Sequence, residues 1–352
     1  MNKKFLLKGF LNAIIILFYF CSISLADPMF PFPQHLPYAQ DTTYPDHKSP
    51  AQLDEEAVSA YLTWKNKYLE KSSKESDGHP RFRIKIGMDS SERTLSEGQG
   101  YGMMIIAYMA GADPQAQIIF DGLWEFFNDN RSVNDQRLMD WSVPEDESPD
   151  GETDGSAFDG DCDIAFSLLL ADRQWGSNAR INYRYEAEQV LAGIMEKEIG
   201  PESFLPLLGD WVDPYGEVYN QYTNRTSDFM PDHFKAFQRI TGWNAWGKIL
   251  SKTQQILTAI QSNYSMTTGL LPDFIEPCSP ADLEHMPARS DFLEGPWDGD
   301  YYYNAGRIPW RVGIDALLNN DQISREQVKK ISLWAEQIAN SDPKKFLAGY
   351  KL

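Results

Sequence analysis

The chain has 352 residues, a net charge of −19 and hydrophobic residues at 42% of its positions. This length accommodates two average domains or one large one. An acidic chain repels nucleic acid and anionic membrane surfaces, so we expect neither as a partner. The charge is compatible with a cationic substrate, although exported proteins without any charged ligand are often acidic too.

The N-terminal 26 residues have the pattern of a secretory signal peptide. Three lysines precede an apolar run at residues 13–20, and the segment "SISLADP" offers a cleavage site after Ala26. The apolar run is too short for a membrane anchor. We therefore expect a secreted or periplasmic protein that is free of the membrane once residues 1–26 are removed. The proline-rich residues 27–50 are predicted to form an irregular arm.

Apolar residues recur at helical spacing through most of the remaining chain. Helices are predicted over residues 51–71, 97–110, 114–127, 163–175, 181–198, 232–240, 244–263, 312–318 and 324–339. Strand-like alternation is limited to the short segment 81–86. Many helices joined by alternately short and long loops, without a linker, favour one domain over residues 51–352 with an all-α toroid of paired helices.

Two cysteines remain after the signal peptide, Cys162 and Cys278. In an exported protein they could form one disulfide, or Cys162 could be a buried free thiol.

The segment "SEGQGYGM" places Glu97 beside Gly98, Gly100 and Gly102 at the start of an apolar helix. Each glycine costs a helix about 1 kcal/mol relative to alanine. Their missing side chains leave room for another group to approach the backbone. A carboxyl group in such a place suits a general acid that faces a bulky neutral substrate. The spacing is not a nucleotide-binding pattern, because no strand precedes it.

A purely structural reading of the same segment is available. Ser96 could cap the helix and Gln99 could complete a capping box, with Glu97 favoured by the positive end of the helix dipole. Capping does not require the glycines, so both readings stay open.

In "SAFDGDCDIAF", Asp159, Asp161 and Asp163 alternate just before an apolar helix. The segment lacks the glycine and the final glutamate of a calcium-binding loop. One aspartate could cap the helix while the others face solvent, but three acids are more than a cap needs.

The segment 289–311 combines acids, tyrosines, tryptophans and three arginines. Such a mixture is poor core material, because each buried polar group needs a partner. It predicts a wall of a polar cleft in which Arg307 pairs with carboxylates. His233 and His285 do not cluster with cysteines at metal-ligand spacing, so no metal or other cofactor is expected.

Several motifs in one order, "SEGQGYGM", "LMDW", "DGDCDIAFSLLLADRQWG", "SDFMPDHFKAF" and "YYYNAGRIPWR", resemble glycoside hydrolase family 8. The resemblance covers nearly the whole chain after the signal peptide. It implies an (α/α)6 barrel and inverting hydrolysis of β-1,4-linked glycans without a cofactor. Glu97 matches the family's proton donor, and Asp159 matches the carboxylate that holds the sugar at the cleavage point.

The sequence departs from the cellulase and xylanase branch of this family at Asn304, where that branch has the aspartate that serves as base. An amide cannot take a proton from water. The chain is similar here to the chitosanase and lichenase branch, which has asparagine at this position and a glutamate from a preceding loop as base. The candidates are Glu294 and Glu284, and we prefer Glu294 because it lies in the same short segment as Asn304, which could orient the attacking water.

The sequence therefore predicts a monomeric, endo-acting, inverting hydrolase of a β-1,4-linked polysaccharide, with chitosan favoured because glucosamine units are cationic. The alternatives are an endo-β-1,4-glucanase acting on cellulose or lichenan and, motivated by Asn304, an inactive glycan-binding protein. Trp141, Trp211 and Tyr303 are the candidates for stacking on sugar rings, and Asn304 and Arg307 for polar contacts with the substrate.

Overall fold

The computed structural model describes residues 26–40, 42–72, 78–86, 93–148, 155–278, 284–340 and 342–352. Residues 1–25 of the predicted signal peptide lie outside this part of the chain. None of the helices within it is both long and apolar enough to span a bilayer.

Helices dominate the described residues, as predicted. The α-helices there are α1 (Pro50–Tyr68), α2 (Ser96–Tyr108), α3 (Ala116–Asp129), α4 (Phe158–Trp175), α5 (Tyr183–Lys197), α6 (Pro231–Thr241), α7 (Asn244–Asn263), α8 (Ile308–Leu318) and α9 (Gln322–Ala339). Short 3-10 helices are η1 (Thr226–Asp228), η2 (Ala305–Arg307) and η3 (Pro343–Lys345). The start of α4 differs from the predicted 163–175, because the helix includes the whole alternating acidic segment.

The strands are short and antiparallel. They are β1 (Leu69–Lys71), β2 (Phe82–Ile84), β3 (Thr94–Leu95), β4 (Ser142–Val143), β5 (Asn224–Arg225), β6 (Phe274–Pro277) and β7 (His285–Pro287). β1 pairs with β2, β3 with β4, and β6 lies between β5 and β7. The predicted strand segment 81–86 thus contains β2.

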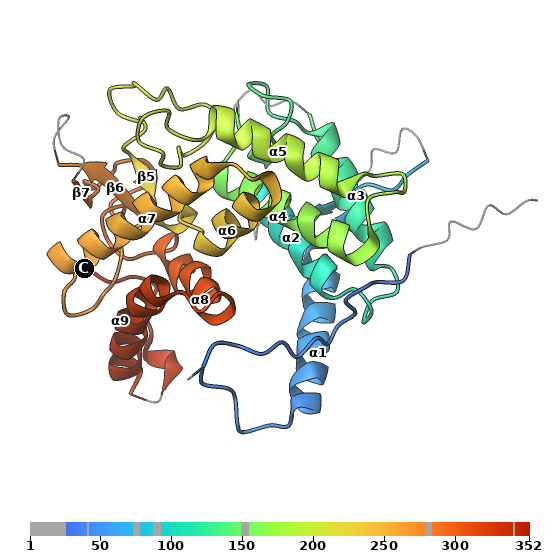
Figure 1. Ribbon diagram of the computed structural model, residues 1–352, viewed down its shortest axis with the longest axis horizontal. Coiled ribbons are helices and arrows are strands. Elements are labelled where there is room, and N and C mark those ends of the chain that lie inside the picture. Colours follow the sequence, from blue (N-terminus) through green and yellow to red (C-terminus); the bar gives the residue numbers. More distant parts are fainter. Residues whose placement is uncertain are drawn as a thin grey trace, which may run out of the picture.

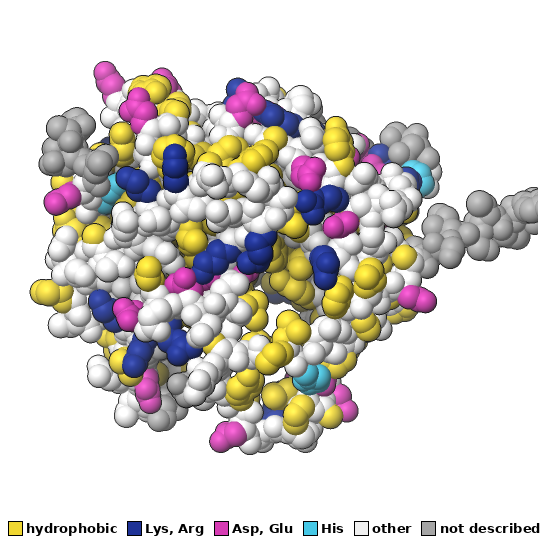
Figure 2. All heavy atoms as spheres, viewed as in Figure 1, with side chains coloured by type: hydrophobic (Ala, Val, Ile, Leu, Met, Phe, Trp, Pro, Cys, Tyr) yellow, Lys and Arg dark blue, Asp and Glu magenta, His cyan; other side chains and the backbone are white. Residues whose placement is uncertain are grey.

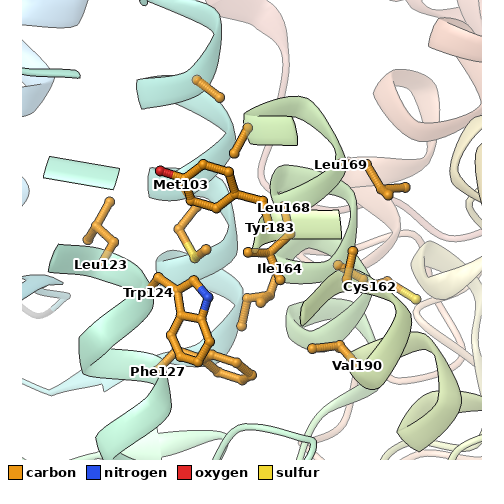
Figure 3. Close-up of a cluster of buried hydrophobic side chains, with 14 of the residues drawn as sticks. Met103, Leu123, Trp124, Phe127, Cys162, Ile164, Leu168, Leu169, Tyr183 and Val190 are labelled. Carbon is orange, nitrogen blue, oxygen red and sulfur yellow. The ribbon is translucent and has the colours of Figure 1, made fainter. Parts of the chain in front are cut away.

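The main core lies between α2, α3, α4 and α5. Figure 3 shows Met103 of α2, Trp124 of α3 and Leu168 of α4 converging between these helices, and all three are buried. Helices that follow one another in the chain pack together, as in the pairs α4–α5, α6–α7 and α8–α9. In addition, α2 packs on α4. Figure 1 shows α2 and α4 near the centre of the helical array, with α1 and the α8–α9 pair on separate sides.

Residues 26–40 and 42–49 form neither helix nor strand. This arm spans from the α2 side to the α8 side, because the Phe32 N–H donates to the Ala110 carbonyl (2.7 Å) and the Ala39 N–H to the Leu317 carbonyl (2.9 Å). It ends at α1, where Ser49 is the N-cap in a capping box with Gln52.

Cys162 is buried and Cys278 is exposed, and both are free thiols. The sequence left open a Cys162–Cys278 disulfide or a buried free thiol at Cys162, and the structure has the free thiol. Burial raises the pKa of the Cys162 thiol well above its usual value.

Candidate active site

Two of the three glycines that follow Glu97, Gly100 and Gly102, serve close packing of α2. A Cβ atom on Gly100 would lie 2.7 Å from the Asp163 Cβ, and one on Gly102 would lie 2.3 Å from Ile84 of β2. Gly160 of α4 faces α2 in the same way, with its Cβ position 2.2 Å from the Ser96 Oγ. The groups that approach the bare backbone at Gly100 and Gly102 are therefore other parts of the fold. The missing side chains at Gly100 and Gly160 bring α2 and α4 into close contact.

The predicted capping box is also absent. Leu95 is the N-cap of α2 without a side-chain hydrogen bond, and Ser96 lies within the helix. The Gln99 side chain instead accepts from the Ile84 N–H (3.0 Å) and donates to the Leu123 carbonyl (2.9 Å). The start of α2 is held by its neighbours rather than by its own cap, which fixes the position of Glu97.

The three aspartates at the start of α4 separate by helical geometry. Residues two apart in an α-helix point about 200° from each other, so Asp159 and Asp163 share a side that Asp161 does not. Asp161 accepts the Met139 N–H (2.9 Å), and Asp163 binds the buried Arg311 through two contacts of 2.6 Å. Arg311, expected in a cleft wall, is a core residue paired with Asp163.

Arg307 lies at the centre of the site, in η2 at the start of α8. Its Nη1 contacts Glu97 and donates to the Asp159 Oδ2 (3.0 Å). Its Nη2 donates to the Ser227 Oγ (3.0 Å) and the Asn304 Oδ1 (2.6 Å). One guanidinium thus connects residues that are far apart in sequence, and it pairs with carboxylates as predicted.

Two arginines, Arg307 and Arg225, contact the Asp159 carboxylate. Its Oδ2 also accepts from Arg225 Nη1 at 2.9 Å. Burial alone would raise the pKa of Asp159, but the positive charges of Arg225 and Arg307 outweigh burial and hold this pKa below its usual value. Asp228, 3.9 Å from Arg225, is the opposite case, because burial raises its pKa to about 7.

Glu97 has a second partner on its own helix. The Tyr101 hydroxyl donates to the Glu97 Oε1 at 2.7 Å. Burial raises the pKa of Tyr101, so it is a neutral hydrogen-bond donor at ordinary pH. The Glu97 side chain is 27% exposed, which leaves it accessible to a ligand.

Glu294 lies next to Asn304. The Asn304 Nδ2 donates to the Glu294 Oε2 at 2.8 Å, and Asn304 is buried while Glu294 is exposed. Since the Asn304 Oδ1 accepts from Arg307, Glu294 and Glu97 are joined through two intervening side chains.

Glu284 lies elsewhere. It contributes to a cavity of about 330 Å³ together with Lys252 and Asn263 of α7, and the lining does not include Glu97 or Asn304. Of the two glutamates considered, Glu294 is the one that the structure brings to the other site residues.

The three predicted aromatic platforms are all partly exposed. Trp141 and Trp211 are 40% exposed and Tyr303 is 71% exposed. The Trp141 carbonyl accepts the Ser96 N–H (3.0 Å), which places this residue beside the start of α2, and Tyr303 directly precedes Asn304. Trp141 and Tyr303 therefore lie on segments next to the site.

Sequence reasoning missed three residues of this arrangement, Arg225, Ser227 and Asp273. Asp273 is buried and accepts the backbone N–H groups of Tyr302 and Ala305. Arg225 lies in the two-residue strand β5, Ser227 in η1 and Asp273 directly before β6. No periodic pattern in these short elements draws attention to a single polar residue.

Residues 48–344 match the family model described as glycosyl hydrolases family 8. The chain belongs to glycosyl hydrolase family 8. It is therefore a glycoside hydrolase with the all-α, (α/α)6 fold that the sequence predicted.

Two named relatives and one solved structure resemble this chain over most of its length. The chain is 37% identical to a beta-glucanase of Niallia circulans, over 94% of this chain and 78% of the relative. It is 36% identical to an endoglucanase of Bacillus sp. (strain KSM-330), over 94% of this chain and 69% of the relative. The apo structure of a beta-1,3-1,4-glucanase from Paenibacillus sp. X4 superposes with a TM-score of 0.85 at 37% identity, covering 92% of this chain and 82% of the other.

Proposed function

We propose that this protein is an endo-acting β-glucanase that hydrolyses mixed-linkage β-1,3-1,4-glucan with inversion, using Glu97 as general acid and Glu294 as general base. One observation carries the proposal. Glu97 and Glu294 belong to one hydrogen-bonded network, joined through Arg307 and Asn304. Neither carboxylate contacts the other directly, because the two intervening side chains separate them.

This separation suits an inverting mechanism. Inverting enzymes hold the two carboxyl groups about 6.5–9.5 Å apart, so that a water molecule fits between the base and the sugar. Glu97 protonates the leaving glycosidic oxygen while Glu294 removes a proton from the water that attacks the anomeric carbon on the opposite face. Asn304 cannot act as the base, but its amide orients the Glu294 carboxylate.

Asp159 has a different task. Held by Arg225 and Arg307, it stays ionised and cannot donate a proton at ordinary pH. A fixed carboxylate of this kind accepts hydrogen bonds from sugar hydroxyl groups and holds the ring at the cleavage point. Trp141, Trp211 and Tyr303 supply flat apolar surfaces for neighbouring rings.

Two observations support a neutral glucan as the substrate. The relatives and the solved structure that resemble the chain at 36% identity or more are named for glucans. In addition, the carboxylates at the centre of the site already have cationic partners, which leaves less negative charge for a cationic sugar. Figure 2 shows acidic and basic side chains interspersed over one face of the molecule.

Chitosan, which the net charge of −19 favours, is the second candidate substrate. Reducing-sugar release from lichenan, carboxymethylcellulose and chitosan separates the candidates. We expect the highest rate on lichenan, and a higher rate on chitosan would replace the glucan proposal. An inactive glycan-binding protein would release no sugar from any of the three.

The Glu97→Gln variant tests the acid. Glutamine has the shape of glutamate but no proton to give, so we expect lichenan hydrolysis to fall by several orders of magnitude while the near-UV circular dichroism spectrum is unchanged. Near-normal turnover would refute the assignment.

A further inference from the structure

Two buried aspartates bind the backbone on which the proposed base and its amide partner are carried. Asp298 is 3% exposed and accepts the N–H groups of Leu293 (2.7 Å), Glu294 (3.0 Å) and Gly295 (3.1 Å). Three N–H groups directed at one carboxylate fix the backbone of the turn from which the Glu294 side chain projects.

Asp273 does the same for Asn304. It is 3% exposed and accepts the N–H groups of Tyr302 (3.0 Å), Asn304 (3.2 Å) and Ala305 (2.7 Å). Its Oδ2 also accepts from the Asn304 side-chain Nδ2 at 3.3 Å, the atom that donates to Glu294 at 2.8 Å.

This second contact determines how the amide of Asn304 is oriented. Its Nδ2 faces the two carboxylates of Asp273 and Glu294, and its Oδ1 faces the Arg307 guanidinium at 2.6 Å. A flipped amide would place oxygen against two carboxylates and nitrogen against a guanidinium. The surroundings therefore permit one orientation, in which Asn304 donates to Glu294.

The two aspartates with the N–H groups that they bind, here called the Asp273 and Asp298 clamps, are also joined to each other. The Asp273 N–H donates to the Asp300 carbonyl (2.9 Å), and the Phe274 N–H donates to the Asp298 carbonyl (2.8 Å). Backbone hydrogen bonds thus hold the start of β6 against the turn at residues 293–300. The relative placement of Glu294 and Asn304 therefore depends on the backbone that Asp273 and Asp298 hold.

We infer that Asp273 and Asp298 are positioning residues for hydrolysis, which hold the Glu294–Asn304 pair in the geometry needed to activate water. The inference rests on the proposed role of Glu294 as base. Neither aspartate touches the substrate in this account, and both act through the pair.

The test uses Asp273→Asn and Asp298→Asn, each of which keeps the side-chain shape but replaces one acceptor oxygen with a donor that opposes a backbone N–H. A misplacement near 1 Å can cost about 100-fold in rate. We expect kcat on lichenan to fall by about 10- to 100-fold with little change in KM. Should an Asn variant not fold, the Ser variant at the same position, which leaves space for water to accept the N–H groups, replaces it.

A matched control is Asp315→Asn in α8. Asp315 is equally buried, but its partner Lys235 lies on α6, outside the site. This variant should lose stability while its kcat stays near that of the parent. If Asp315→Asn lowers kcat as much as the clamp variants, the effect is a general consequence of a weakened fold and the inference is wrong.

A second measurement separates positioning from structural damage. In a Glu294→Ala background with azide present, azide attacks the anomeric carbon without a base, the C–O bond breaks, and the leaving oxygen takes the Glu97 proton. Adding Asp298→Asn to this background should leave the rate unchanged, because there is no base left to position. An equal loss in both backgrounds, or no loss of kcat in the parent background, would overturn the inference. If Glu294→Ala alone keeps the full rate without azide, the proposed base itself fails, and that result is distinct from a failure of the clamps.

Discussion

The contact between α2 and α4 can be tested with two glycines of one helix. Gly98 and Gly100 lie two residues apart in α2, but their surroundings differ. Among the residues that the structure describes, a Cβ atom on Gly98 would meet the Ile86 and Ile84 side chains, at 3.5 and 3.8 Å, which are ordinary contacts. A Cβ atom on Gly100 would lie 2.7 Å from the Asp163 Cβ and 3.1 Å from the Gly160 carbonyl oxygen.

The two alanine substitutions are expected to change the free energy of unfolding in opposite directions. Replacing glycine by alanine in a helix stabilises it by up to about 1 kcal/mol where the new methyl group fits. Overpacking a tight contact costs about 1–3 kcal/mol, and the cost is at the upper end where the obstacle is backbone that cannot rotate away. Gly98→Ala should therefore raise the free energy of unfolding by about 0.5–1 kcal/mol, and Gly100→Ala should lower it by about 2 kcal/mol.

Urea unfolding followed by tryptophan fluorescence measures both values, provided that the slope with urea is the same in the parent and the variants. Gly100→Ala should also slow lichenan hydrolysis, because displacement of α4 moves Asp159 away from Arg307. If the two variants change stability by the same amount and in the same direction, the close packing of α2 on α4 is not the reason for these glycines.

Three further predictions concern buried charges and sugar binding. Asp163→Asn should lower the free energy of unfolding by about 3–5 kcal/mol in a urea titration, because it leaves the buried Arg311 without its charged partner. Burial raises the pKa of Asp228 to about 7, so the folded state holds a proton that the unfolded state releases near pH 4. Stability from this group is present at low pH and lost as pH rises towards 7, and Asp228→Asn should make the decline over this range shallower in unfolding titrations at several pH values. Trp211→Ala should weaken binding of a glucan oligosaccharide in calorimetry by about 5- to 150-fold, taking the about 1–3 kcal/mol by which an aromatic side chain binds one stacked nucleic-acid base as the measure of ring stacking.

The helices could be predicted because their signal is local. Apolar residues at a period of 3.6 indicate which segments are helical, and α7 has the predicted bounds of Asn244–Asn263. The start of α4 was predicted too late because Asp159, Asp161 and Asp163 indicate a polar loop when their partners are unknown. Their partners, Met139, Arg225 and Arg311 among them, come from other parts of the chain.

The site could be predicted in part for the same reason. Glu97 lies beside glycines and Asp159 lies in a run of alternating acids, and both match motifs of the family. Gly100 and Gly102 serve packing of α2. The preference for Glu294 over Glu284 followed from sequence proximity to Asn304, and the structure brings these two residues into contact. Asp273 gave no such signal, since its role depends on a turn at residues 302–305 that no local pattern specifies.

The most direct test of the central claim is the rate of lichenan hydrolysis by Glu294→Gln, with Glu284→Gln as the matched control. Both variants remove one exposed carboxylate, but only Glu294 contacts Asn304. We predict a loss of several orders of magnitude for Glu294→Gln and a rate close to the parent for Glu284→Gln. A normal rate for Glu294→Gln together with a large loss for Glu284→Gln would contradict the account.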